Sequence, residues 1–276
     1  MSIAPLTADE YHADPSPGVS LSSSIANILL EQSPRHAWLA HPKLNPNFVR
    51  ETDSRFDLGS AAHLMLLERR EDAIVRVEAN DWRTKAAQEA RDIAQAAGKY
   101  AVLERHYQDV VAMCAAAHDF LAESELSDIL DTGIAEHTLT WQEKGRWYRC
   151  RPDLLADDHR VVLDYKSTQN AAPEVVSKQI GRMGYDLQAE FYCHGVDVVC
   201  GVEPAFVFLF QEIMPPYACS LISLSNAYRA IGQGKVHRAV QIWAQCLDSN
   251  LWPAYTNQIH YVEPKPWDLT QFEGTL

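Results

Sequence analysis

Positive charge is scarce in this sequence: 24 lysines and arginines stand against 37 acidic residues, a formal net charge of −13. Because phosphate binding draws its affinity from lysine and arginine, this balance argues against a protein that coats nucleic acid. The chain does not open with a basic region followed by an apolar one, and no apolar stretch approaches membrane-spanning length. We therefore expect a soluble intracellular protein with no membrane partner.

Closely spaced cysteines are also missing. The six cysteines, at positions 114, 150, 193, 200, 219 and 246, form no CxxC pair, and nothing indicates secretion. Disulfides are therefore not expected, and the thiols are interpreted as scattered core residues. The motifs GxSxG, GxGxxG, GxxxxGK[ST] and HExxH are absent as well. This removes the usual starting points for serine hydrolases, dinucleotide-binding proteins, P-loop proteins and zinc proteases.

The order of local patterns predicts an α/β fold. An Ala-rich helical block from 82 to 125 is broken at Gly98, and β-rich segments dominate from about 134 to 167. A helical segment follows from Pro173 to Val199. AFVFLFQEI and YACSLISL then predict a further strand pair, before a last helix over 226–247.

Length and composition predict one large domain. At 276 residues and 47% hydrophobic content, the chain can bury a substantial core. We expect a single domain over residues 1–276, with a helical N-terminal part over about 18–130. A mixed central sheet flanked by helices is expected over about 131–276.

An acid and a lysine stand at the end of a β-rich run in RVVLDYKST, residues 160–168. Side chains alternate along a strand, so Asp164 and Lys166 share one face while Tyr165 takes the other. A [DE]-x-K triplet arises by chance about once in a chain of this composition. Glu263-Pro264-Lys265, in a proline-containing tail, is interpreted as that chance copy. Taken alone, Asp164 and Lys166 fit an ordinary ion pair at a strand end.

The preceding segment, WYRCRPDLLADDHR, changes this interpretation. It predicts a strand and a polar turn, with a hairpin into the next strand. Pro152 fits only at a bulge or at a strand end, where the chain bends and presents Asp153. Asp153, Asp164 and Lys166 would then converge. Carboxylates brought together in a buried place typically bind a cation, and oxygen ligands of this type suit Mg²⁺ or Mn²⁺.

Two helical segments carry further polar residues. In LQAEFY, Gln188 and Tyr192 are four residues apart and share one helix face. In FDLGSAAHLMLLE, His63 follows Gly59 by four residues and interrupts an apolar helix. A single histidine in such a place is more often a satisfied core residue than a functional one. Tyr192 is equally suited to packing on the sheet.

These motifs together resemble those of a known superfamily. Gly59-x-x-x-His63, Arg151-Pro152-Asp153, Asp164-x-Lys166 and Gln188-x-x-x-Tyr192, in this order, are similar to the motifs of PD-(D/E)XK nucleases of the RecB-like group. LSSSIANILLEQSPRHAW and WRTKAAQEARDIAQAAGK resemble, more narrowly, the phage and prophage exodeoxyribonuclease VIII (RecE) type. The resemblance spans about residues 18–200 and implies the restriction-endonuclease-like core.

The resemblance implies a role for each motif residue. Lys166 would orient or deprotonate the attacking water, and orientation is the larger role because a lysine with a pKa near ~10.4 is a poor base at neutral pH. Gln188 and Tyr192 would line the site beside the catalytic groups. The implied metal ligands are Asp153, Asp164, the Tyr165 main-chain carbonyl, His63 and Glu136. Glu136 also fits a solvated strand residue.

Contacts with DNA are assigned to Ser24, Arg151, Arg83 and Lys85. Ser24 belongs to a serine triplet with the form of a helix N-terminus, whose N–H groups bind a cap or a phosphate. The resemblance implies a 5′-phosphate there. Arg83 and Lys85 lie in a basic cluster interleaved with acids, a pattern equally typical of a solvated helix face. A local basic lining would admit DNA despite the acidic total.

The function implied by the resemblance is a magnesium-dependent exodeoxyribonuclease, with Mn²⁺ as the alternative metal. It would degrade linear double-stranded DNA from 5′ to 3′ and leave 3′ single strands for recombination. A ring-shaped homo-oligomer (a tetramer), a single-strand annealing partner, and the cytoplasm of a bacterium or a phage-infected host cell are also implied.

Two other functions stay open. One is an endonuclease of the same superfamily that cuts internally or at special structures. The other is a noncatalytic DNA-binding or assembly protein with the same fold. Some RecB-like nucleases hold an iron–sulfur cluster, but none is expected here because the closely spaced cysteines are missing.

Overall fold

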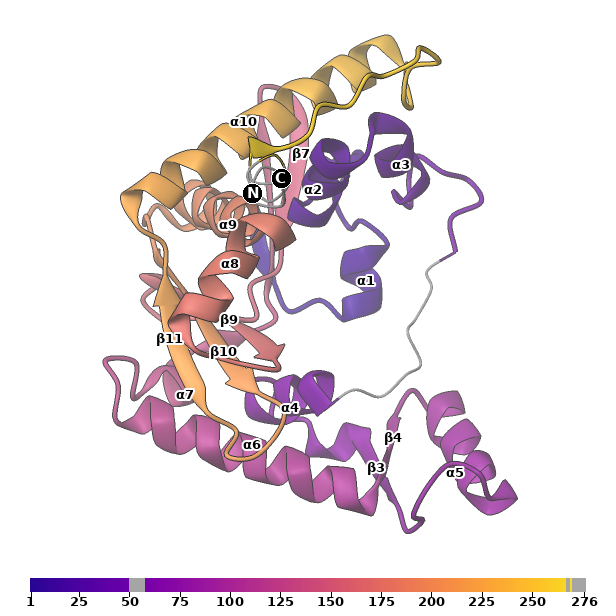
Figure 1. Ribbon diagram of the computed structural model, residues 1–276, viewed down its shortest axis with the longest axis vertical. Coiled ribbons are helices and arrows are strands. Elements are labelled where there is room, and N and C mark those ends of the chain that lie inside the picture. Colours follow the sequence, from indigo (N-terminus) through magenta and orange to yellow (C-terminus); the bar gives the residue numbers. More distant parts are fainter. Residues whose placement is uncertain (50–57, 267–268, 270–276) are drawn as a thin grey trace.

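The computed structural model describes residues 1–49, 58–266 and 269, and a five-stranded mixed sheet forms its centre (Figure 1). The strand order is β11-β10-β9-β8-β5. β9 and β10 run parallel, whereas the other neighbours are antiparallel. The strands are β5 (Ile134–Ala135), β8 (Leu154–Leu155), β9 (Val161–Thr168), β10 (Ala205–Glu212) and β11 (Cys219–Ser223). The predicted mixed sheet and the strand pair after residue 204 are confirmed.

A second sheet has the order β1-β6-β7-β2, and β3 and β4 form a separate parallel pair. Their bounds are β1 (Ser2–Ala4), β2 (Ser20–Leu21), β3 (Ile74–Val77), β4 (Tyr100–Leu103), β6 (Thr138–Glu143) and β7 (Arg146–Cys150). Strands therefore also occur in the part of the chain expected to be helical. Strands this short contain too few residues to give a period-two pattern.

The chain crosses from one sheet to the other at Pro152. We expected the strand with Tyr148 and Cys150 to form a hairpin with the next one, but β7 pairs with β6, and the partner of β9 is β8. Proline has no main-chain N–H to continue a ladder, so β7 ends at Cys150 and β8 begins two residues after Pro152. The bend predicted at Pro152 is confirmed, and only the pairing was wrong.

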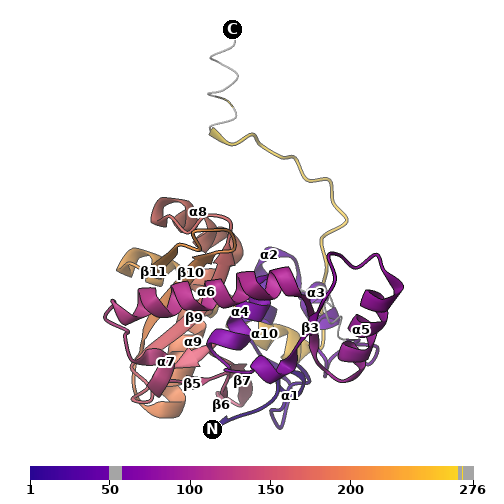
Figure 2. The same ribbon diagram turned by 90° about the horizontal axis from the view of Figure 1, so that it is seen from below.

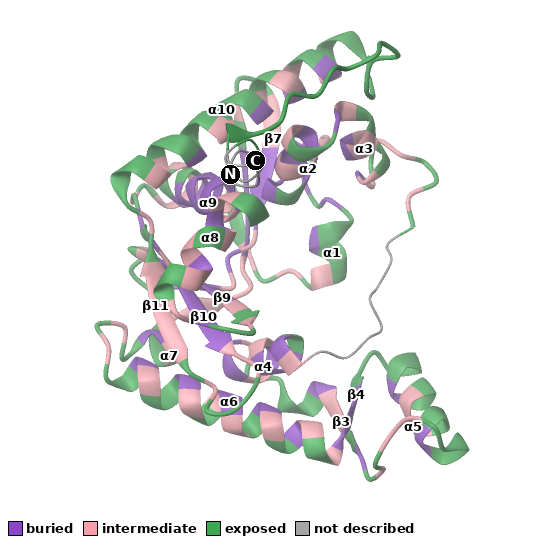
Figure 3. Ribbon diagram, in the orientation of Figure 1, coloured by how far each residue is buried: buried purple, intermediate pink, exposed green. Residues whose placement is uncertain are grey.

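Helices cover both faces of the central sheet (Figures 1 and 2). Val162 and Phe208 pack in one buried cluster, together with side chains of α9 (Tyr185–Cys200) and α10 (Asn226–Ser249). Leu163 and Tyr165 pack in another cluster, with α4 (Leu58–Leu66) and α6 (Glu104–Ala122). The expected alternation along β9 is confirmed, and Asp164 shares the face that α9 covers. Figure 3 shows how strongly β10 and α9 are buried.

Glycine breaks the helix expected from Pro173 to Val199. The structure has α8 (Pro173–Met183) and α9, separated at Gly184, whose φ of 72° is in the left-handed region. A Cβ there would come within 2.3 Å of Asn27 Oδ1. The break predicted at Gly98 in the helical block of 82–125 is confirmed, because α5 (Lys85–Ala96) ends before it and α6 follows, but the strand β4 between the two helices was not expected.

The remaining helices are short. They are α1 (Ala8–His12), α2 (Ser23–Glu31), α3 (Pro34–Leu39) and α7 (Ile129–Thr132). Ser22 caps α2 by accepting a bond from the Ile25 N–H, which confirms the helix start predicted at the serine triplet. Among the described residues, no helix has both the length and the apolar character needed to span a bilayer.

Candidate active site

The hairpin of β8 and β9 brings two carboxylates together. Leu154 pairs with Leu163, so the next step of the antiparallel register sets Asp153 opposite Asp164. The main-chain N–H of Tyr165 donates a hydrogen bond of 2.8 Å to Asp153 Oδ2. This bond fixes the Asp153 side chain against β9.

Asp164 is fully buried and lies between a lysine and an amide. Lys166 forms an ion pair with its Oδ1 atom, and Gln188 Nε2 donates to its Oδ2 atom at 2.7 Å. Burial, followed by the charge of Asp153, raises the pKa of Asp164 to about 7 despite the opposing charge of Lys166. Oδ1 has no partner other than Lys166 among the described residues, so beyond this ion pair it keeps a lone pair available for a cation.

Glu136, which follows β5, has a strained backbone that is held from two directions. Its φ of 57° is in the left-handed region, which costs a non-glycine residue about 1–3 kcal/mol. The Glu136 N–H donates to the Asp153 carbonyl at 3.1 Å. Arg151 donates from Nε to the Glu136 carbonyl at 3.1 Å and pairs through Nη1 with Glu136 Oε2 at 2.7 Å. Arg151 therefore aims the Glu136 carboxylate.

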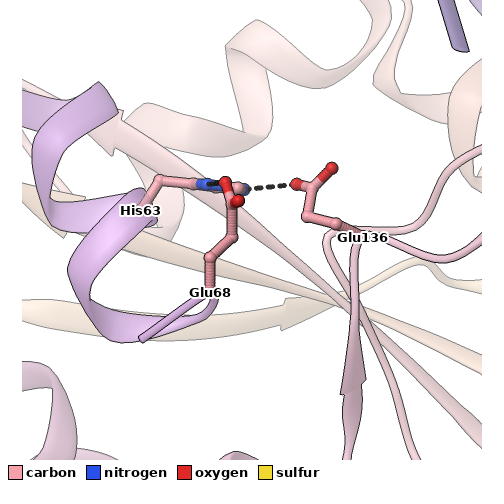
Figure 4. Close-up of side chains that lie close together, drawn as sticks. All are labelled: His63, Glu68 and Glu136. Carbon is pink, nitrogen blue, oxygen red and sulfur yellow. Dashed lines mark ion pairs between the residues drawn. The ribbon is translucent and has the colours of Figure 1, made fainter. Parts of the chain in front are cut away.

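His63 projects from α4 into a group of carboxylates (Figure 4). Its Nε2 atom lies 3.2 Å from Glu136 Oε1 and 3.5 Å from Asp153 Oδ2, and its Nδ1 atom lies 3.7 Å from Glu68 Oε1. Burial alone would lower the pKa of His63, but hydrogen bonds to Asp153, Glu136 and Glu68 raise it to about 12. At neutral pH His63 is therefore a positively charged imidazolium, and it supplies among these carboxylates the positive charge that a bound metal ion would supply. His63 is not the satisfied apolar-core residue that its sequence context favours.

Glu68 is a member of this group that the sequence did not identify. It follows the end of α4 by two residues, outside any helical or strand periodicity. Its carboxylate reaches back to His63, as Figure 4 shows. An acid five residues after a histidine at a helix end was the only signal in the sequence.

The two aspartates have opposite pKa shifts. For Asp153, burial favours the neutral form, but the hydrogen bond and charge of His63 outweigh it and hold the pKa below its usual range. For Lys166, burial favours loss of the proton, but Asp164 and then Asp153 raise the pKa above its usual value. Lys166 also lies 5.1 Å above the Tyr185 ring. It is an ammonium group across the physiological range.

His63, Glu68, Glu136, Arg151 and Lys166 line one cleft of about 420 Å³, and Asp153 and Asp164 lie behind its wall, in contact with His63 and Lys166. Its walls are Gly59, Ser60, His63, Leu64, Glu68, Tyr100, Glu136, Arg151, Tyr165, Lys166, Ser167 and Tyr185. A second depression of about 450 Å³ lies among the β6–β7 hairpin, α9 and α10. Its buried Glu190 is already engaged by Arg229 and Gln233, at 2.8 and 2.9 Å. The candidate active site is therefore the smaller cleft, of about 420 Å³.

Other predicted residues lie elsewhere. Ser24 is exposed on α2, and the side chains of Arg83 and Lys85 are 92% and 90% exposed beside Asp81 and Glu89. These three residues do not line the cleft. Their contact with DNA stays a prediction.

Tyr192 lies in the core beneath the sheet. It is 7% exposed and packs edge-on against Phe206, with 6.2 Å between ring centroids. Burial raises its pKa well above the usual value. Its role in catalysis stays a prediction, as does metal binding by the Tyr165 carbonyl.

The donor set fits a divalent metal ion. His63, Glu68 and Glu136 each offer a ligand atom, and these atoms lie within 4.8 Å of one another. Asp153 lies against the same histidine, and Lys166 is the single partner of the Asp164 Oδ1 atom among the described residues. Carboxylate-rich sites of this composition suit Mg²⁺ or Mn²⁺, and an imidazole ligand shifts the balance toward Mn²⁺.

Asp153 directly precedes β8, and Asp164 and Lys166 lie on β9, in a mixed sheet with helices on both faces. This is the arrangement of the PD-(D/E)XK nuclease fold. The chain belongs to the family described as PDDEXK-like domain of unknown function (DUF3799), whose sequence profile matches residues 23–265. The superfamily expected from the motifs is thereby confirmed. The narrower resemblance to the RecE type stays a prediction.

One solved structure supports the fold. A protein from Eubacterium rectale, provisionally described as an exonuclease, is 12% identical with a TM-score of 0.61, over 96% of this chain and 98% of that one. An alkaline exonuclease from Laribacter hongkongensis is also 12% identical, over 71% of this chain and 92% of that one. Its TM-score of 0.29 is too low for structural inference. No curated protein matches the sequence significantly.

Proposed function

We propose that this protein is a magnesium-dependent exodeoxyribonuclease that degrades linear double-stranded DNA from 5′ to 3′ and leaves 3′ single strands for recombination. The observation that carries the hydrolytic part is that His63, Glu136 and Lys166 line one cleft while Asp153 and Asp164 contact His63 and Lys166 directly behind it. The polarity rests on the resemblance to RecE-type enzymes. A tetrameric ring, a single-strand annealing partner and a cytoplasmic location rest on it too.

Metal ligation is assigned to Asp153, Asp164, Glu136 and His63, with Glu68 added by the structure. When bound, the metal ion supplies a Lewis acid and lowers the pKa of water for attack on phosphorus. Lys166 donates a hydrogen bond that orients the attacking water, because its raised pKa keeps it protonated and so unable to accept a proton from that water. Gln188 holds Asp164, and Arg151 holds Glu136, so each carboxylate has a fixed direction.

We expect metal binding to release a proton from His63. The pKa of His63 is about 12 in the metal-free fold, whereas a ligating imidazole must be neutral. Affinity for Mg²⁺ or Mn²⁺ should therefore rise as the pH rises. Calorimetric titration at pH 8.5, in buffers of different ionisation enthalpy, counts the protons, because Asp164, with a pKa of about 7, is already ionised there.

The matched variant is His63→Ala. It should bind metal with no proton release, and its affinity should change little with pH around 8.5. Equal proton release by the wild type and the variant would contradict ligation by His63.

Nucleotide release from DNA tests the activity directly. Linear duplexes labelled at the 5′ or the 3′ end and covalently closed circular DNA are incubated with Mg²⁺, and with a chelator as the control. We expect mononucleotides from linear DNA only, and early loss of the 5′ label.

Each other outcome would replace part of the proposal. Cutting of the circle would point to an endonuclease. Binding without turnover in Mg²⁺ and Mn²⁺ would point to a noncatalytic DNA-binding protein. Early loss of the 3′ label would reverse the polarity. Sedimentation that shows only a monomer at working concentration would contradict the ring.

A further inference from the structure

An exposed aromatic ring borders the cleft and has no place in the core. Tyr100 is the first residue of β4, is 51% exposed, and lines the cleft together with His63 and Lys166. Its neighbour Ala101 is buried in the small cluster that holds β3, β4 and α5 together. Because side chains alternate along a strand, Tyr100 takes the opposite face of β4.

The unit that carries Tyr100 stands apart from the main sheets. Figure 1 shows β3, β4 and α5 beyond the end of α4, away from the central sheet. The unit has its own cluster of Val77, Ala87, Ala94 and Ala101, and Tyr100 is not a member of it. A large ring that faces water beside the catalytic carboxylates gains nothing from packing within this unit.

The size of the cleft restricts what can reach these carboxylates. Its volume of about 420 Å³ is within the range of small-molecule pockets, about 300–1,000 Å³, and a duplex is far wider than such a pocket. The other two tyrosines of the cleft are already engaged. Tyr165 is buried and donates its hydroxyl to Gln211 at 2.7 Å. Tyr185 has Lys166 5.1 Å above its ring and packs against Phe208 and Phe210. Tyr100 is thus the ring whose surface faces an incoming group.

We propose that Tyr100 is a base-stacking platform that selects an unpaired strand end for cleavage. This inference rests on the proposed nuclease function. One nucleotide of the strand occupies the cleft, its phosphate faces His63, Glu136 and Lys166, and a base lies on the Tyr100 ring. Aromatic stacking tolerates every base and strengthens binding of single-stranded nucleic acid by about 5- to 150-fold per base.

A cycle of protein and substrate changes tests the stacking. Cleavage rates are compared for wild type, Tyr100→Phe and Tyr100→Ala, on DNA with an unpaired end that is intact or abasic at its terminal nucleotides. We expect Tyr100→Ala to lower kcat/KM by about 5- to 150-fold on intact ends, mainly through KM. Tyr100→Phe should match the wild type. On abasic ends all three should be equal, because the base that stacks is missing.

A fluorescence measurement keeps the test independent of turnover. Short single strands carrying 2-aminopurine at the 5′ or the 3′ end are titrated with protein in Ca²⁺. We expect stacking to quench the terminal probe with wild type and Tyr100→Phe, but not with Tyr100→Ala. The control is Tyr261→Ala, because Tyr261 is 89% exposed in the C-terminal tail.

Failure of the inference and failure of the proposed function give different results. Absence of cleavage by the wild type, with quenching that depends on Tyr100, would refute the nuclease and support the platform. Full activity and unchanged quenching in Tyr100→Ala would refute the platform alone. An equal loss of activity on intact and abasic ends would also refute it.

Discussion

Replacing Asp164 with asparagine is expected to abolish metal-dependent cleavage and, at the same time, to stabilise the metal-free protein at pH 8. Asp164 is fully buried, and Asp153 lies on the neighbouring strand with its own negative charge. Asparagine has nearly the same shape without the charge. The Gln188 amide can rotate to accept a bond from it, so the packing is retained. The loss of a metal ligand removes the activity.

The pH dependence of this stabilisation follows from the pKa of Asp164. The pKa of Asp164 is about 7 in the folded chain, against an ordinary value of 3.8. Protonation of Asp164 therefore adds to the free energy of unfolding in full below pH 3.8, and this contribution disappears as the pH rises through 7. Between pH 5 and pH 8 the free energy of unfolding of the wild type should fall by on the order of 2 kcal/mol, whereas that of Asp164→Asn should not show this decrease. In thermal melts with a chelator, the Tm of the variant minus the Tm of the wild type should therefore be about 4–8 °C larger at pH 8 than at pH 5.

Asp186→Asn provides the matched control. Asp186 is also fully buried and pairs with a lysine, Lys235, at 2.8 Å, but it lies on α9, without the strand register that sets Asp153 opposite Asp164. Breaking this pair should cost about 3–5 kcal/mol. If Asp164→Asn destabilised the protein as much as Asp186→Asn at pH 8, the charge repulsion assigned to the site would be refuted.

Replacing Lys166 with alanine is expected to lower kcat by about 10²- to 10⁴-fold while metal and DNA binding persist. Lys166 forms an ion pair with Asp164 and takes no part in the group of His63, Glu68 and Glu136. Removing a cation beside the carboxylates should leave metal affinity equal or higher. Single-turnover cleavage, calorimetry with Mg²⁺ and DNA binding in Ca²⁺ separate the three quantities.

The control for Lys166→Ala is Lys178→Ala, which removes an exposed lysine from α8 and should have no effect. A normal kcat in Lys166→Ala would eliminate the role in orienting water. A large loss of metal affinity with kcat unchanged at saturating metal would instead make Lys166 a structural group of the metal site.

The same charge arrangement connects stability and function. Glu68, Glu136, Asp153 and Asp164 are brought close together, and the cations that oppose them include His63, Lys166, Arg151 and Arg70. In the metal-free state His63 neutralises part of this charge by holding a proton. A site that is unfavourable until a cation binds is what a metal-dependent enzyme requires.

Local chemistry was sufficient for much of the fold. Pro152 cannot continue a ladder, so the sequence itself predicted the bend that presents Asp153. Alternation along β9 predicted that Asp164 and Lys166 share a face, and both α9 and the strand pair after residue 204 followed from local periodicity. The helix that was expected to be continuous breaks at Gly184, where the close approach of Asn27 from α2 is a long-range contact.

The composition of the site was only partly accessible from the sequence. Asp153, Asp164 and Lys166 were found because short strands place nearby residues in a fixed register. Glu68 and the left-handed turn at Glu136 depend on contacts with His63, Arg151 and the Asp153 carbonyl.

The sequence by itself determined which residue types are available, that a strand begins at Val161, and that an acid and a lysine share one face of it. Only the tertiary structure decided that His63 meets carboxylates instead of the core, that Arg151 holds Glu136, and that Tyr100 borders the cleft. The reason is physical: alternation and helical periodicity act over a few residues. Burial and charge pairing depend on segments that are distant in the chain and meet only on folding.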